Sequence, residues 1–264
     1  MRVFVEGIGL LGPGLNGWQT SQGLLAGSTP YQEVALAIPP TELLPPAERR
    51  RAPLSVRLAL AVGQEAVAQC GRNVVELASV FASATGDGDN IHHICETLAA
   101  NGRELSPTRF HNSVHNAPSG YWSIATKAMM PSTALCAHDA SFAAGLLEAA
   151  AQVVVDGNAA VLICYDTPYP QPLHAVRPIS AAFGVALVLN GKQTAQSLAE
   201  LEIGIIEGHL SATSLDVREL EALCSDVPAA RCLPLLAALA GTGTASVLLD
   251  YFAGSQITVE VRSC

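Results

Sequence analysis

Residues Asn116 to Pro168 have the sequence NAPSGYWSIATKAMMPSTALCAHDASFAAGLLEAAAQVVVDGNAAVLICYDTP. The pattern predicts a short strand over 132–136, a turn of small residues, a helix over 141–155 and a second strand over 159–165. Apolar side chains fall on one face of that helix, and Asp156-Gly157 ends it. A nucleophile at the start of such a helix would be activated by the helix dipole, but the spacing alone favours a plain packing unit.

Strands and helices alternate on both sides of this stretch. A strand over 3–5 leads into a glycine-rich turn, and a helix over 54–70 precedes a buried strand over 77–84. Helices over 89–100 and 119–130 follow, then strands over 184–189 and 201–206 and a terminal hairpin of 247–251 with 257–261. Buried strands that alternate with long helices predict a layered α/β fold.

The composition excludes several classes of protein. Half of the 264 residues are apolar and 14% are charged, which excludes a disordered chain. Fourteen basic against twenty-three acidic residues give a net charge of −9, so a nucleic-acid partner is not expected. Only Lys127 and Lys192 are lysines, and lysine is depleted at protein interfaces. This scarcity favours a chain that is partly covered by a partner.

The cysteines and the apolar runs bear on the compartment. The seven cysteines form no CxxC pair, so neither a zinc ribbon nor a disulfide framework is indicated. The opening MRVFVEGIGL contains Glu6 and two glycines, unlike a signal peptide. The longest apolar run, 142–155, is too short to span a bilayer. We therefore expect a cytoplasmic protein without a membrane span.

Three weaker motifs have alternative readings. Gly7, Gly9 and Gly12 spell GxGxxG, but Pro13-Gly14 interrupts the helix that a dinucleotide site needs, so a tight turn is the better interpretation. The order of His92, His93, Cys95, His111 and His115 fits no zinc spacing, so no metal or other cofactor is expected. The basic run Arg49-Arg50-Arg51 is either a solvated helix end or a docking patch for an acidic partner.

Four segments together resemble the β-ketoacyl synthases of the thiolase-like fold. They are VFVEGIGLLGPG near the start, Asn116 to Gly157, RPISAAFGVALVL from Arg177 to Leu189, and GTGTAS from Gly241 to Ser246. The resemblance is nearly continuous to Leu189 and patchy after it. It implies a layered αβαβα fold with a complete first half, residues 1–206, and a strongly shortened second half, 207–264, in one compact unit.

The departures from the family determine the expected function. In the family, the nucleophile is a cysteine at the start of the long helix; here that position falls on Asp139 or Ala140, and neither is a cysteine. Cys136 lies about a turn too early, and Ser141 would need a base, for which His138 is the local candidate. The family's two catalytic histidines lie in its second half, where this chain has only His209.

The resemblance is closest to the chain length factors, in particular the short forms of aryl-polyene-type pathways. It implies a non-catalytic subunit that shapes the acyl pocket of a heterodimeric β-ketoacyl synthase in fatty acid or polyene biosynthesis. The implied partners are a catalytic ketosynthase and, mainly through that ketosynthase, an acyl carrier protein. The residues expected near the shared pocket or interface are Asn116, Trp122, Pro131, Phe142, Phe183, Gly241 and Gly243.

Two alternatives belong to other functional classes. One is an active acyltransferase or condensing enzyme that uses Cys136 or Ser141 as its nucleophile, which a thiol of depressed pKa would favour. The other is a homodimeric acyl-binding protein without a catalytic partner. An obligate subunit would be unstable alone, and a homodimeric binding protein would not.

Overall fold

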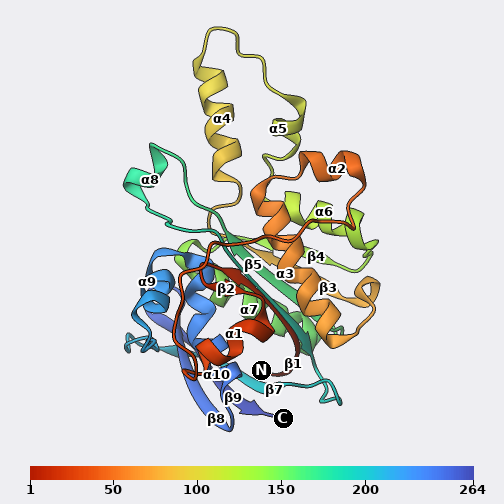
Figure 1. Ribbon diagram of the computed structural model, residues 1–264. Helices are drawn as coiled ribbons and strands as arrows, with labels where there is room; N and C mark the ends of the chain where they lie inside the picture. The colour runs from red at the N-terminus through yellow and green to blue at the C-terminus, as the bar shows by residue number, and fades with distance from the viewer.

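The computed structural model describes all residues, 1–264, and contains one nine-stranded mixed sheet (Figure 1). Its strands lie in the order β4-β3-β5-β6-β1-β7-β9-β8, and the short β2 pairs with β1. Only β3 pairs in parallel, with β4 and with β5; the other pairs are antiparallel. The strands are β1 (Arg2–Gly12), β2 (Leu15–Asn16), β3 (Ala78–Ala82), β4 (Ser132–Leu135), β5 (Ala160–Asp166), β6 (Phe183–Asn190), β7 (Ala199–Glu207), β8 (Thr244–Asp250) and β9 (Ser255–Ser263).

Helices cover the sheet from two sides. The α-helices are α1 (Trp18–Leu25), α2 (Pro46–Arg51), α3 (Leu54–Cys70), α4 (Gly88–Ala99), α5 (Pro107–His111), α6 (Ala117–Thr126), α7 (Ser141–Val155), α8 (Leu173–Val176), α9 (Arg218–Asp226) and α10 (Leu233–Ala240). The 3-10 turns are η1 (Val74–Glu76), η2 (His138–Ala140) and η3 (Pro228–Cys232). None of the helices combines the length and the apolar character needed to cross a bilayer.

The apolar core is divided by the sheet into two clusters. The smaller cluster lies under α3 and α6 and includes Phe81 and Trp122. The larger cluster lies on the other face, where α7, η3, α10 and α1 pack between the two ends of the curled sheet. Helix α7 is central to it because Phe142, Leu146 and Val153 on its buried face are almost fully shielded from solvent. The layers therefore run helix, strand, helix, strand.

The glycine-rich motif at the N-terminus lies inside β1 and does not form the tight turn that the sequence predicted. A Cβ on Gly7 would come 2.0 Å from the Ala66 carbonyl oxygen, and a Cβ on Gly9 would come 2.0 Å from that of Val62. Both carbonyls belong to α3. The glycines thus let this helix pack directly against β1, and the strand runs on to Gly12.

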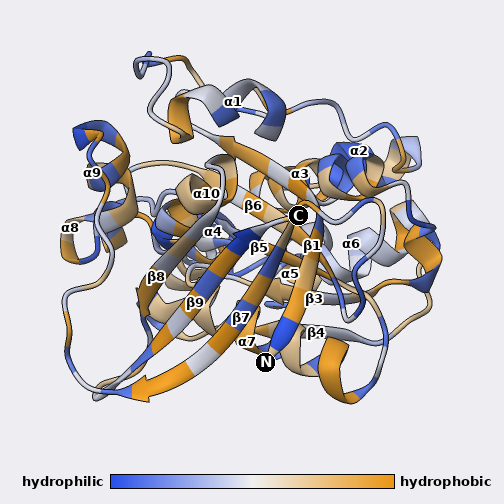
Figure 2. Cartoon of the chain, turned by 90° about the horizontal axis from the view of Figure 1, so that it is seen from below, coloured by the Kyte–Doolittle hydropathy of each residue, from blue (hydrophilic) through white to orange (hydrophobic).

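The shortened second half contributes strands β8 and β9, which extend the sheet beyond β7, and the outer face of these three strands is open (Figure 2). Along β7, Leu201 and Ile203 point into the core, while Glu200 and Glu202 point outward. Both glutamates pair with Arg262 of β9, at 2.7 and 3.3 Å. This inward-apolar and outward-polar alternation suits a sheet with one solvated face. At these positions the outward side of β7 and β9 is therefore polar and charged.

Candidate functional site

The turn between β4 and α7 is the place where the family resemblance puts a nucleophile. Strand β4 ends at Leu135, η2 spans His138–Ala140, and α7 begins at Ser141. His138 has a φ of 53°, a left-handed conformation that costs a non-glycine residue about 1–2 kcal/mol. Its ring points to solvent, and its Nδ1 lies 3.4 Å from Asp139 Oδ1. The turn is therefore held in a strained backbone geometry.

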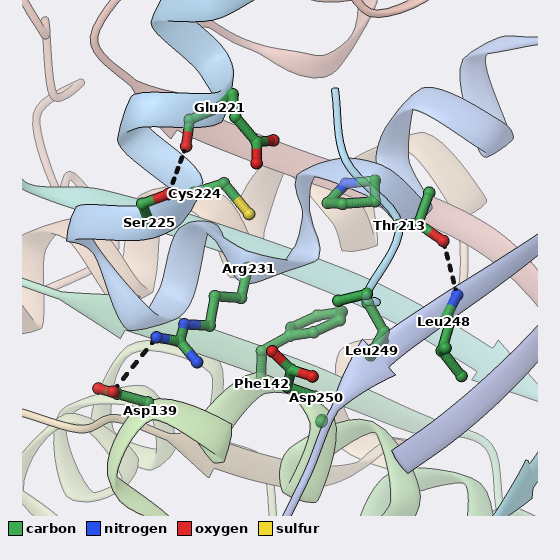
Figure 3. A pocket seen from close by; sticks show the side chains of 13 residues that line it. Asp139, Phe142, Thr213, Glu221, Cys224, Ser225, Arg231, Leu248, Leu249 and Asp250 are labelled. Atoms are coloured by element: carbon green, nitrogen blue, oxygen red, sulfur yellow. Dashed lines mark hydrogen bonds and ion pairs between the residues drawn. The ribbon is translucent and has the colours of Figure 1, made fainter. Parts of the chain in front are cut away.

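Two arginines hold the carboxylate of Asp139 in this turn. The guanidinium of Arg177, just after α8, lies 2.6 Å from Asp139 Oδ1. That of Arg231, in η3, lies 3.2 Å from Oδ2, as Figure 3 shows. All three side chains are partly buried, with 24% to 41% of their surface exposed. The three groups tie the start of α7 to two segments that are distant in sequence. Ala140, the other position predicted for the nucleophile, is buried and offers only a methyl group.

Neither fallback nucleophile is paired with a base. The Ser141 hydroxyl is fully buried; it donates to the His138 carbonyl at 2.7 Å and accepts from the Ala137 N–H at 3.1 Å. Its hydrogen bonds therefore hold the turn. The Cys136 thiol is exposed and donates only to the Ala84 carbonyl, at 3.8 Å. No hydrogen bond connects either side chain to an imidazole, because His115 donates to the Ser83 carbonyl instead.

A cavity of about 230 Å³ opens beside Asp139 (Figure 3). Phe142 of α7, Cys224 of α9, Arg231 of η3 and Leu249 of β8 are among its lining residues. Burial raises the pKa of the Cys224 thiol to about 11, and nearby carboxylates add to this effect while Arg231 opposes it. The thiol is therefore protonated at neutral pH and is not a nucleophile.

Charges in this cavity are mainly negative. Its walls carry the carboxylates of Asp139, Glu221 and Asp250 against the one guanidinium of Arg231. Glu221 accepts a hydrogen bond from the Leu215 N–H, and Asp250 accepts one from the Gln256 amide. A second cavity of about 370 Å³ is also lined by Asp139, together with Arg177. Asp139 thus lines both cavities, at one of the two positions where the sequence resemblance predicts the nucleophile.

A second carboxylate, missed in the sequence, is buried at the end of β5. Asp166 accepts hydrogen bonds from the Ser83 hydroxyl, from the N–H and hydroxyl of Thr85, and from the Ala84 and Ala229 N–H groups, at 2.8 to 3.1 Å. Burial raises the pKa of Asp166 to about 6, although the hydrogen bonds that it accepts act in the opposite direction and lower the pKa. Asp166 therefore links the loop after β3 to η3, beside the cavity. The only sequence signal for it was an acid directly after an apolar strand.

The residues expected at a shared pocket or interface lie in different parts of the fold. Phe142 lines the cavity, while Phe183 packs on Gly12 inside the larger core. Trp122 is buried on the opposite face of the sheet, edge-on to Phe81 with ring centres 6.4 Å apart.

The remaining expected residues lie at the surface. Asn116 begins α6, and Pro131 is exposed just before β4. Gly241 and Gly243 form the turn from α10 to β8, where Gly243 hydrogen-bonds Ser263. The structure therefore brings together Asp139, Ala140, Ser141 and Phe142 and leaves the other expected residues elsewhere. Arg177 and Arg231 complete the site, and no spacing in the sequence linked them to Asp139.

Two of the histidines considered for a metal site, His92 and His93, pair with acids along one helix. On α4, His92 lies 3.2 Å from Glu96, and His93 lies 3.2 Å from Glu96 and 3.7 Å from Asp89. No group of three His, Cys, Asp or Glu side chains in the structure is arranged to hold a metal ion. These contacts are those of a solvated helix face.

Comparison with known proteins assigns the family. Residues 18–237 match the family model described as the β-ketoacyl synthase N-terminal domain, so the chain belongs to this family. No curated protein matches the sequence. The resemblance to the β-ketoacyl synthases inferred from the sequence is therefore confirmed.

Solved structures share the fold at low identity. One is the ketosynthase ApeO in complex with its chain length factor ApeC from Xenorhabdus doucetiae: TM-score 0.73, 21% identity, 98% of this chain and 99% of that chain covered. The ishigamide ketosynthase/chain length factor has a TM-score of 0.75 at 14% identity, with 100% and 99% covered. A third is the AntDE:AntF complex, a type II PKS acyl-carrier protein in complex with its ketosynthase bound to the hexaketide. Its TM-score is 0.77 at 14% sequence identity, and the match covers 100% of this chain and 99% of that chain. These likenesses confirm the predicted thiolase-like fold class.

Proposed function

We propose that this chain is a non-catalytic, chain-length-factor-type subunit that shapes the acyl pocket of a heterodimeric β-ketoacyl synthase. The observation that carries the proposal is the state of the nucleophile position. Asp139 is held there by two arginines, and Ala140 beside it has no reactive group. A carboxylate neutralised by two guanidinium groups is a poor nucleophile for a thioester, because its lone pairs are engaged in ion pairs.

The edge strand β4 supports a partner subunit. The Ser79 and Ser83 N–H groups of the β3 side donate to the Pro131 and Leu135 carbonyls, so by alternation Ala134 directs its N–H and C=O to the open edge. Unpaired edges of this kind accept a strand from another chain.

Helices α6 and α7 flank this edge strand. The Ser119 and Ser132 hydroxyls lie 2.8 Å apart, and Gln152 donates to Thr133 at 3.0 Å. Exposed apolar side chains follow on both flanks, at Met129 after α6 and at Val155 at the end of α7, with 90% and 79% of their surface accessible. Large exposed apolar groups beside an open strand edge suit burial by a partner.

The likenesses to solved complexes favour a catalytic ketosynthase as that partner. The resemblance in the sequence implies that the pair acts in fatty acid or polyene biosynthesis. One of these structures pairs a ketosynthase with its chain length factor, and another holds an acyl-carrier protein with its ketosynthase. An acyl carrier protein would dock mainly on the ketosynthase, because carrier proteins of this family are acidic and this chain has a net charge of −9.

Mass spectrometry after incubation with acyl-loaded carrier protein tests the proposal, with and without a catalytic ketosynthase. We expect an acyl adduct only on the ketosynthase, within a stable heterodimer. An adduct on Cys136 or Ser141 of this chain alone would contradict the proposal and favour an active acyltransferase. A stable homodimer that ignores the ketosynthase would instead favour an acyl-binding protein.

A further inference from the structure

A groove of about 540 Å³ lies on the outer helix layer, on the other face of the sheet from Asp139. Its walls are α3, α6, η1 and the segment 39–43, which crosses over these helices. Leu43, Val67 and Val74 give it an apolar lining. The volume falls within the range of small-molecule sites, about 300–1,000 Å³.

Two residues that line this groove each carry a buried side-chain donor that has no acceptor. The indole N–H of Trp122, a residue with 1% of its surface exposed, has no partner, and neither has the side-chain amide nitrogen of Gln64. Both residues line the groove, one from α6 and the other from α3. The hydroxyl of Thr41, in the wall segment 39–43, is also buried and unpartnered. A buried donor without a partner costs about 1–3 kcal/mol, so native chains keep few of them.

We propose that this groove binds a small, neutral, apolar molecule whose carbonyl oxygen accepts hydrogen bonds from Trp122 and Gln64. A neutral acceptor is favoured because the donors are uncharged, no lysine or arginine lines the groove, and Glu42 stands at its rim. A carboxylate there would meet repulsion without a compensating cation. The site is separate from the proposed acyl pocket and does not rest on the proposed function.

The two tryptophans of the chain make the test direct. In a Trp18→Phe background, Trp122 is the only tryptophan and reports occupancy by its fluorescence. The probes are octanamide, octanoate and octylammonium, which share a chain and differ in the acceptor and the charge. We expect octanamide to change the Trp122 emission in a saturable way. Octanoate should bind at least tenfold more weakly than octanamide, and octylammonium should not bind.

Variants place the binding in the groove. Gln64→Leu removes one donor and should weaken octanamide binding about tenfold; Ala68→Phe fills the groove and should abolish it. Gln22→Leu, on the exposed face of α1, is the matched control and should bind like the parent. Isothermal titration gives a second readout. Equal binding of the three probes, no emission change with octanamide, or binding that survives Ala68→Phe would overturn the proposal.

Discussion

At Asp166, burial and hydrogen bonding act in opposite directions on one carboxyl group. Burial raises its pKa to about 6 from an ordinary 3.8, so between these values the folded chain holds a proton that the unfolded chain has lost. Its contribution to the free energy of unfolding is therefore fully present below about pH 4 and is lost as the pH rises through 6. The loss is about 2–3 kcal/mol.

Asp166→Asn removes this titration. In urea unfolding, we expect the stability advantage of the parent over the variant to shrink by about 2–3 kcal/mol between pH 4 and pH 7. An amide also cannot accept all five hydrogen bonds, so the variant should be less stable at the acid end of the range. A difference between the two proteins that does not vary with pH would show that burial does not govern this group.

Gly9 tests the close approach of α3 to β1. A methyl group there would lie 2.0 Å from a helix carbonyl, and backbone atoms cannot move aside as a flexible side chain can. We expect Gly9→Ala to lower the free energy of unfolding by about 2–4 kcal/mol in urea. The control is Gly120→Ala in α6, where nothing lies within 4 Å of the new methyl group, and it should be neutral or stabilising by up to about 1 kcal/mol. Equal effects of both changes would contradict the packing role.

Among the elements, the edge strand β4 offers a test that separates folding from assembly. Proline at position 134 removes the Ala134 N–H, which faces the open edge and makes no hydrogen bond within the sheet. The variant should therefore still fold. The same change blocks strand addition by a partner. We expect Ala134→Pro to abolish co-purification with a ketosynthase, while Ala134→Val, which keeps the N–H, retains it. Normal assembly of the proline variant would place the interface elsewhere.

The elements with clear periodicity were predictable from the sequence. Helices α3, α4, α6 and α7, the apolar strands and the terminal hairpin of β8 with β9 form where the pattern placed them. Short helices such as α1, α9 and α10 were missed, because segments of eight or nine residues are too short to show a helical period. The prediction of a tight turn at the glycine motif was wrong. The glycines are needed because helix α3, more than 50 residues further along the chain, packs against them. Nothing in the local sequence indicates that contact.

Of the candidate site, only the residues that are neighbours in the sequence could be predicted. The sequence placed the altered nucleophile position at Asp139 or Ala140 at the start of a helix, and the structure puts both residues in that turn. The partners of Asp139, by contrast, come from segments 38 and 92 residues further on, Arg177 and Arg231. Contacts between distant segments depend on the packing of α7 against η3, which no local pattern reveals.

For the whole molecule, the question is whether a thiol alone would restore catalysis. The shortened second half contains one histidine, His209, which is exposed and lines neither cavity beside Asp139. Condensation needs groups that stabilise the developing charge after decarboxylation as well as a nucleophile. Restoring the cysteine in this chain supplies only the nucleophile.

We therefore expect Ala140→Cys and Asp139→Cys to give no condensation product from acyl- and malonyl-loaded carrier protein, measured by mass spectrometry against a catalytic ketosynthase as positive control. Asp139→Cys also leaves two arginines unpaired and should cost about 1–2 kcal/mol of stability, because both ion pairs are partly exposed. Ala140→Cys keeps both ion pairs, so it tests the effect of the added thiol without the loss of stability. If the Ala140→Cys chain alone forms product, the second half holds catalytic groups after all, and the missing thiol would be the sole cause of inactivity. If it does not, the result agrees with the proposal that this chain depends on a catalytic partner subunit for the charge-stabilising groups.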